Sequence, residues 1–117
     1  MVKQLQMKML LLVAMLMGWG VSAGAAQVVT FSNSDFEGQG TSGSGSAITA
    51  TKEGVTFACN KGYGTTQIRC YSGGEITISS SSPITKIEFT FSGTYTGGLD
   101  EAYNDLSNAS WSKTLSS

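Results

Sequence analysis

The sequence contains no histidine. This absence removes the commonest general base, the usual nitrogen ligand for metals and any Ser-His-Asp triad. The only two cysteines, Cys59 and Cys70, are too few for a structural zinc site without other ligands, and they do not form a CxxC redox motif. A glycosidase needs two carboxylates that face each other across a cleft, and nothing in the sequence indicates such a pair. We therefore expect a non-enzymatic protein without a metal or cofactor.

Charge is also scarce. Seven basic and eight acidic residues leave a net charge of −1 over 117 residues. No basic cluster offers an electrostatic footprint for nucleic acid. The densest acidic group, Asp100, Glu101 and Asp105, does not have EF-hand spacing, so a solvated acidic loop is favoured there over a calcium site.

A long apolar run occurs once, near the N-terminus. Lys3 and Lys8 precede the run Met9–Met17, which is followed by glycines and a small-residue tail ending at Ala26. This order is typical of a helical signal peptide cleaved after residue 26. The run is shorter than the ~20 apolar residues that a membrane span needs, which disfavours the alternative of a retained anchor. We therefore predict a mature domain of residues 27–117 that is exported to the periplasm, the cell surface or the medium.

Strand-like alternation dominates residues 27–117, and it is clearest in Ile84–Ser92. There Ile87, Phe89 and Phe91 fall on one face, so this segment is the best candidate for the core. Glycine, serine and proline separate the segments, and residues 38–46 form a low-complexity loop. Such short strands predict an antiparallel β-sandwich or barrel. Residues 99–106 have the spacing of one or two helical turns. The other predicted strands are 27–31, 47–51, 54–59, 66–71, 75–79 and 110–115.

The two cysteines lie on strands joined by a predicted hairpin. With Gly64-Thr65 at its tip, Tyr63 would pair with Thr66 and Cys59 would lie opposite Cys70. Export to an oxidising compartment would permit a disulfide between them. Two buried free thiols are the alternative.

Tyrosines are the candidate ligand contacts. Tyr63, Tyr71, Tyr95 and Tyr103 lie on or beside different turns. A tyrosine ring suits both a stacking platform for sugars and ordinary half-buried packing, because it has an apolar body and a polar tip. Both alternatives stay open for these four residues, whereas Trp111 is expected to cap the core.

Four segments carry a resemblance to a known kind of domain: "GVTF" at 54–57, "IRCYSGGEITIS" at 68–79, "ITKIEFTFSGTYTGG" at 84–98 and "WSKTLSS" at 111–117. Together they resemble a secreted domain common in surface and exported proteins of anaerobic Gram-negative gut bacteria. The resemblance implies a jelly-roll-like β-sandwich without catalytic residues. It also implies a truncated or divergent copy, because the strand that closes the sheet after the Trp strand in such domains is absent.

These observations lead to one expected function and one alternative. We expect an exported, non-enzymatic β-sandwich module that binds a polysaccharide or another cell-surface component. The alternative is a structural or spacer domain, or a remnant of a larger surface protein. A fold by itself does not decide between them.

Overall fold

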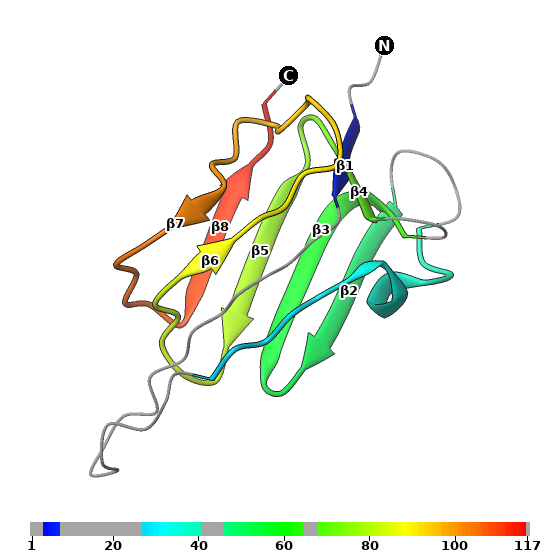
Figure 1. Ribbon diagram of the computed structural model, residues 1–117. Helices are drawn as coiled ribbons and strands as arrows, with labels where there is room; N and C mark the ends of the chain where they lie inside the picture. The colour runs from blue at the N-terminus through cyan, green and yellow to red at the C-terminus, as the bar shows by residue number, and fades with distance from the viewer. Residues whose placement is uncertain (1–3, 8–26, 41–45, 65–67, 117) are drawn as a thin grey trace, which may run out of the picture.

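Figure 1 shows the computed structural model, which describes residues 4–7, 27–40, 46–64 and 68–116. For residues 4–7 only the backbone is described. Regular structure in these ranges is almost entirely β, and every strand pairing is antiparallel. The predicted mainly β, antiparallel fold class is therefore confirmed. The elements are β1 Gln4–Met7, η1 (a 3-10 helix) Asn33–Phe36, β2 Ser46–Lys52, β3 Val55–Tyr63, β4 Ile68–Tyr71, β5 Glu75–Ser80, β6 Ile87–Glu88, β7 Ala102–Tyr103 and β8 Ser110–Thr114.

A six-stranded sheet forms the body of the molecule, with neighbours in the order β1-β4-β3-β5-β8 and with β2 also paired to β3. β3 is its longest strand. It pairs with β5 over Val55–Cys59 and with β4 over Gly62–Tyr63. The register of β2 on β3 shifts between Ser46 and Ile48, so β3 carries one extra residue at this point. The predicted strands at 47–51, 54–59, 75–79 and 110–115 correspond to β2, β3, β5 and β8.

Alternation along these strands gives the sheet one apolar and one polar face, because successive side chains point to opposite sides. Rows of paired residues cross β2, β3, β5 and β8 on the apolar face. These rows are Ala50, Phe57, Ile78 and Trp111, and Ile48, Cys59, Ile76 and Lys113.

The segment 27–40 and strand β6 cross one face of the sheet, in front of it in Figure 1. The predicted strand at 27–31 is only a single bridge at Gln27, but its alternation still buries Val29 and Phe31. Phe36, from η1, is fully buried and meets Phe57 of β3 edge to face, with ring centroids 5.3 Å apart. The apolar face of the sheet is therefore covered in part by the aromatic side chains Phe31 and Phe36 of the segment 27–40.

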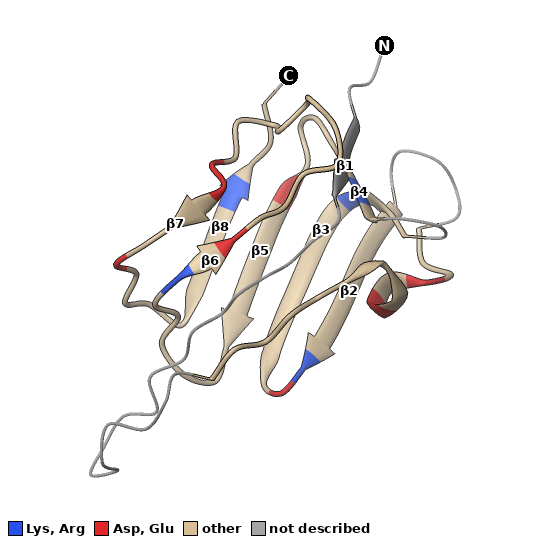
Figure 2. Cartoon of the chain, viewed as in Figure 1, with Lys and Arg blue, Asp and Glu red and all other residues tan. Residues whose placement is uncertain are grey.

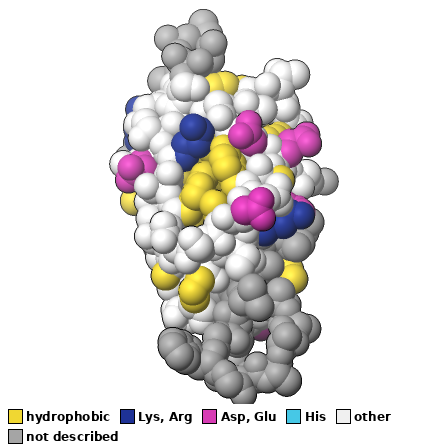
Figure 3. All heavy atoms as spheres, turned by 90° about the vertical axis from the view of Figure 1, so that its left-hand side faces the viewer, with side chains coloured by type: hydrophobic (Ala, Val, Ile, Leu, Met, Phe, Trp, Pro, Cys, Tyr) yellow, Lys and Arg dark blue, Asp and Glu magenta, His cyan; other side chains and the backbone are white. Residues whose placement is uncertain are grey.

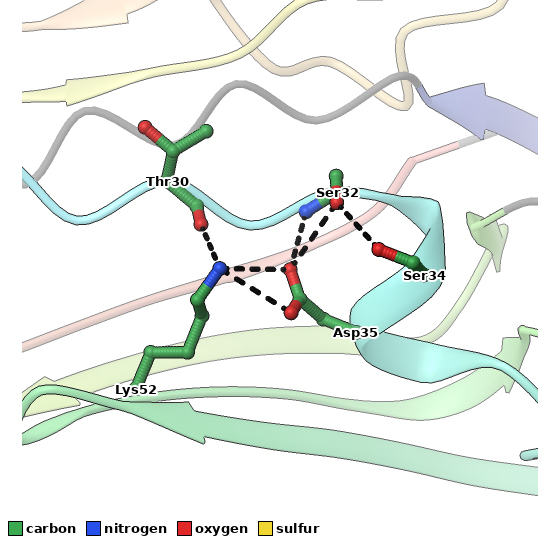
Figure 4. Close-up of polar contacts among 5 residues, drawn as sticks. All are labelled: Thr30, Ser32, Ser34, Asp35 and Lys52. Atoms are coloured by element: carbon green, nitrogen blue, oxygen red, sulfur yellow. Dashed lines mark hydrogen bonds and ion pairs between the residues drawn. The ribbon is translucent and has the colours of Figure 1, made fainter.

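Polar contacts fix the same segment at the sheet margin (Figure 4). The Asp35 carboxylate accepts a hydrogen bond from the Ser32 backbone N–H at 2.7 Å and forms an ion pair with Lys52 of β2 at 3.3 Å. The Lys52 ammonium also donates to the Thr30 carbonyl at 2.8 Å. These bonds connect η1 to the start of the chain segment and to β2.

The core segment predicted at 84–92 is buried as expected. Ile87 is 0% and Phe89 3% exposed, while Phe91 is half-buried and stacks on Phe89. Only Ile87–Glu88 forms a regular strand, β6, and it pairs with β7 in a separate two-stranded sheet. The segment is therefore part of the layer over the large sheet, not a strand within that sheet.

The helical turns predicted at 99–106 are wrong. Ala102–Tyr103 forms β7 instead, paired with β6, and the Phe89 N–H donates to the Glu101 carbonyl at 2.8 Å. The i, i+4, i+7 spacing was misleading because a neighbouring strand satisfies the backbone of this segment. Pairing with another strand competes directly with a helix of only two turns, which is marginal by itself.

The predicted helical signal peptide is tested only at residues 4–7. There the helical expectation is wrong, because Gln4–Met7 forms β1 and pairs with Ile68–Tyr71 of β4. The backbone groups on this side of β4 find partners in that pairing. Residues 8–26, including the apolar run and the cleavage site, lie outside the described residues. Within the described part of the chain, no helix has the length and hydropathy to cross a membrane.

Candidate binding surface

The four tyrosines predicted as a platform do not form one row. Tyr63 packs against Arg69, whose guanidinium carbon lies 5.2 Å from the ring centroid. Tyr71 is only 7% exposed, so its ring offers no stacking face. The Tyr95 hydroxyl donates a hydrogen bond to the Ser116 carbonyl. Burial raises the pKa of Tyr95, which keeps that hydroxyl a donor.

Tyr103 alone joins an aromatic group, which we call the aromatic cluster: Phe89, Phe91, Tyr103 and Trp111. The Tyr103 and Trp111 rings lie 4.9 Å apart, centroid to centroid. Phe89 contacts both of them, at 6.2 Å and 5.8 Å, and is itself buried. The other three members are half-buried, so the cluster has a buried base and a partly exposed rim.

The exposure of Trp111 follows from its strand. β8 pairs with β5, and among the described strands it has no second neighbour. Its alternation places Trp111 and Lys113 on the apolar side, in register with Ile78 and Ile76 of β5. The apolar row therefore ends at an edge strand, where Phe89 and Tyr103 cover only part of the indole. Figure 3 shows the side of the molecule that faces left in Figure 1, where β7 and β8 lie. There a hydrophobic patch is flanked by basic and acidic side chains.

Hydrogen bonds hold the neighbours of the indole in place. The Asp100 N–H donates to the Tyr103 hydroxyl at 2.9 Å, which fixes the phenol ring. Backbone bonds join the loop before β8 to residues 84–85, because the Leu106 N–H donates to the Thr85 carbonyl and the Ile84 N–H to the Asn108 carbonyl. The cluster is therefore held by backbone pairing on both sides.

A shallow pocket of about 60 Å³ lies beside the indole. Its walls combine two apolar side chains with three small polar residues, which supply hydroxyl and amide groups. The ion pair Lys86–Glu88, with 2.6 Å between its nitrogen and oxygen atoms, is neutral as a unit. The pocket is lined by Leu106, Ser107, Asn108, Ser110 and Trp111.

The predicted cysteine register is wrong. Cys70 pairs with Gly62 and Cys59 pairs with Ile76, so the two residues are offset along β3 instead of directly opposed. The offset arises because Tyr63 pairs with Arg69 and not with Thr66, which shifts the pairing of β3 with β4 by three residues from the predicted register. Both cysteines are buried free thiols in the structure.

The two thiols nevertheless lie close enough to share a hydrogen bond, in which Cys70 donates to Cys59. This bond lowers the pKa of Cys59, and together with deep burial it raises the pKa of Cys70. Any thiolate would therefore form on Cys59. The disulfide itself stays a prediction.

Metal binding finds no support in the described part of the chain, where no three His, Cys, Asp or Glu side chains converge. Comparisons with protein-family models, with curated proteins and with solved structures give no match. The resemblance to a secreted surface domain therefore stays a prediction, and the functional argument depends on the aromatic cluster.

Proposed function

We propose that this chain is an exported, non-enzymatic binding module that recognises carbohydrate through the aromatic cluster. The observation that supports this proposal is the Tyr103–Trp111 pair, which is partly exposed at a sheet edge beside a pocket with polar walls. In the same proposal, residues 1–26 are the export signal, and the layered antiparallel strands of residues 27–117 are a jelly-roll-like β-sandwich.

The chemistry of a sugar ring fits this surface. Its C–H face packs on an aromatic ring, while its hydroxyl groups need hydrogen-bond partners at the margin of the contact. Indole and phenol rings supply large, rigid apolar area and each has one polar group. Asn108 and Ser110 supply further donors and acceptors next to Trp111. A few polar groups around an apolar floor are the usual composition of a small-ligand site.

The test is binding of the 117-residue chain to a panel of neutral and acidic polysaccharides by affinity electrophoresis, followed by calorimetry on the best ligand. Trp111→Leu removes the indole but keeps an apolar contact with Phe89. We expect Kd to weaken at least about tenfold, equivalent to ~1.4 kcal/mol. Tyr63→Ala is the matched control, because it removes an aromatic ring outside the cluster and should leave Kd unchanged.

Two results would contradict the proposal. One is the absence of binding to every polysaccharide by a folded wild-type chain, which would favour the structural or spacer role. The other is an equal loss of affinity in Tyr63→Ala and Trp111→Leu. Thermal melting of each variant separates loss of the site from loss of the fold.

A further inference from the structure

Among the described residues, no segment covers the face of the large sheet opposite the core, and this face carries few charged side chains. In Figure 1 the segment 27–40 and β6 lie on the near side of the sheet, and this second face points away from the viewer. Figure 2 shows that most of each strand is free of charged side chains. Residues of this outer face on β2, β3, β5 and β8 are Ala47, Thr49, Thr51, Thr56, Ala58, Asn60, Glu75, Thr77, Ser79, Ser110, Ser112 and Thr114.

Strand register arranges these side chains in rows. One row is Thr49, Ala58, Thr77 and Ser112, and the next is Thr51, Thr56, Ser79 and Ser110. Neighbouring strands lie ~4.8 Å apart, and residues two apart along a strand lie ~6.8 Å apart. The hydroxyl groups therefore form a regular two-dimensional array on this face, both across the strands and along them.

The regular surface is interrupted at Ala58. Its methyl group is shorter than the threonine side chains opposite it on both neighbouring strands, Thr49 on β2 and Thr77 on β5. A hollow of about 160 Å³ opens there. Ala58 and Ala47 contribute apolar methyl groups, while the threonine hydroxyls, Asn60 and Glu75 surround them.

Asn60 and Glu75 are joined by a hydrogen bond, and together they present one donor group and one acceptor group to the hollow. The Asn60 Oδ1 accepts the Glu75 backbone N–H at 2.7 Å, so its Nδ2 is the group left to donate. Among the described residues, no hydrogen bond or ion pair engages the Glu75 carboxylate. A rigid donor thus lies beside an acceptor that is free to receive hydrogen bonds.

We propose that this hollow binds one ring of a neutral saccharide, with a C–H face over the Ala58 methyl group. Two adjacent sugar hydroxyls donate to the Glu75 carboxylate, and a third accepts from the Asn60 Nδ2. A single carboxylate among uncharged groups disfavours a polyanion, and the hydroxyl and amide groups match a polyol. The site lies on the opposite face of the sheet from the aromatic cluster. The proposal therefore goes beyond the proposed function and is tested by different variants.

The experiment uses the full 117-residue chain and calorimetric titration with cellohexaose, maltohexaose and mannohexaose, each to millimolar concentration. Ala58→Ile fills the hollow with a side chain that favours strands, and it points away from the core. In a chain that also carries Trp111→Leu, we expect it to abolish the remaining binding of the hexasaccharide that the wild-type chain binds. Glu75→Gln keeps the shape but removes the charge, and we expect Kd to weaken about tenfold because hydrogen bonds to a charged acceptor are the stronger ones.

Ser112→Ile is the matched control, since it places the same side chain in the same row but outside the hollow. It should keep the wild-type Kd. Each titration is repeated in a Trp111→Leu background, which removes binding at the aromatic cluster, so that the remaining binding reports on the hollow alone. Absence of binding by the folded wild-type chain to all three hexasaccharides would overturn the proposal. So would unchanged binding in both Ala58→Ile and Glu75→Gln, or an equal loss in Ser112→Ile.

Discussion

Phe36 offers a demanding test of how the N-terminal segment is held on the sheet. Its ring is 0% exposed and lies between Phe31, at 6.1 Å, and Phe57, at 5.3 Å. Replacing a buried phenylalanine by alanine costs about 3–5 kcal/mol, from lost burial and from the cavity left behind. The edge-to-face contact with Phe57 contributes within that cost.

The upper part of this range is expected, because the surroundings of Phe36 have little room to collapse. The Gln39 N–H donates to the Phe36 carbonyl at 3.0 Å, and the Gly64 N–H donates to the Gln39 carbonyl at 2.9 Å. A Cβ at Gly64 would lie 2.5 Å from the Phe36 carbonyl oxygen, so the two backbones are already in closest contact. Backbone groups fixed in this way cannot move in to fill a cavity. We expect Phe36→Ala to cost about 4–5 kcal/mol.

Urea denaturation followed by circular dichroism measures this cost. A small domain has a total stability of only about 5–15 kcal/mol, so Phe36→Ala should leave the fold marginal or lost. Phe36→Leu, which refills most of the volume, should cost much less. Phe91→Ala is the matched control at a half-buried phenylalanine of the aromatic cluster. If Phe36→Ala costs no more than Phe91→Ala, the segment 27–40 is not held by its aromatic anchor and the reasoning fails.

Two further predictions concern polar and sulfur contacts. Asp35→Ala should cost about 1 kcal/mol, because it removes the acceptor of a backbone N–H at η1. Lys52→Met should cost less than Asp35→Ala, because the ion pair is partly exposed and screened by solvent. Denaturation midpoints are the measurement, and a lower midpoint for Lys52→Met than for Asp35→Ala would contradict this ranking. In the exported protein we predict a Cys59–Cys70 disulfide worth up to about 3 kcal/mol, reduced by the offset register. The non-reduced mass should then be lower by two hydrogens, whereas two alkylatable thiols would exclude the bond.

Most strands could be predicted because their alternation is local. A pattern such as Glu75–Ser80, with Ile76 and Ile78 in phase, needs no knowledge of its neighbours to indicate a half-buried strand. The same reasoning failed at 99–106, where spacing suited a helix but the pairing partner β6 lies some fifteen residues earlier. The secondary structure of a short segment depends on the strands that pack beside it in space, and these cannot be inferred from the sequence of the segment itself.

The aromatic cluster illustrates the same limit for function. Its members Phe89, Tyr103 and Trp111 come from three separate stretches. The sequence marked Tyr103 as a candidate ligand contact, but it assigned Phe89 to the core and Trp111 to a cap over the core. The tryptophan was a weak signal for a binding surface. It became informative only once β8 was placed at the edge of the sheet.

The sequence by itself determined that the chain is mainly β, that it contains no histidine, and which side chains of each strand share a face. These properties depend on composition and on a two-residue period, both of which can be read locally. Tertiary structure alone decided the register of the cysteines, the edge position of Trp111 and the hollow at Ala58. Each of these depends on which strands lie next to each other and in which register they pair. Strand pairing joins residues that are far apart in the sequence, so it depends on how the whole chain packs.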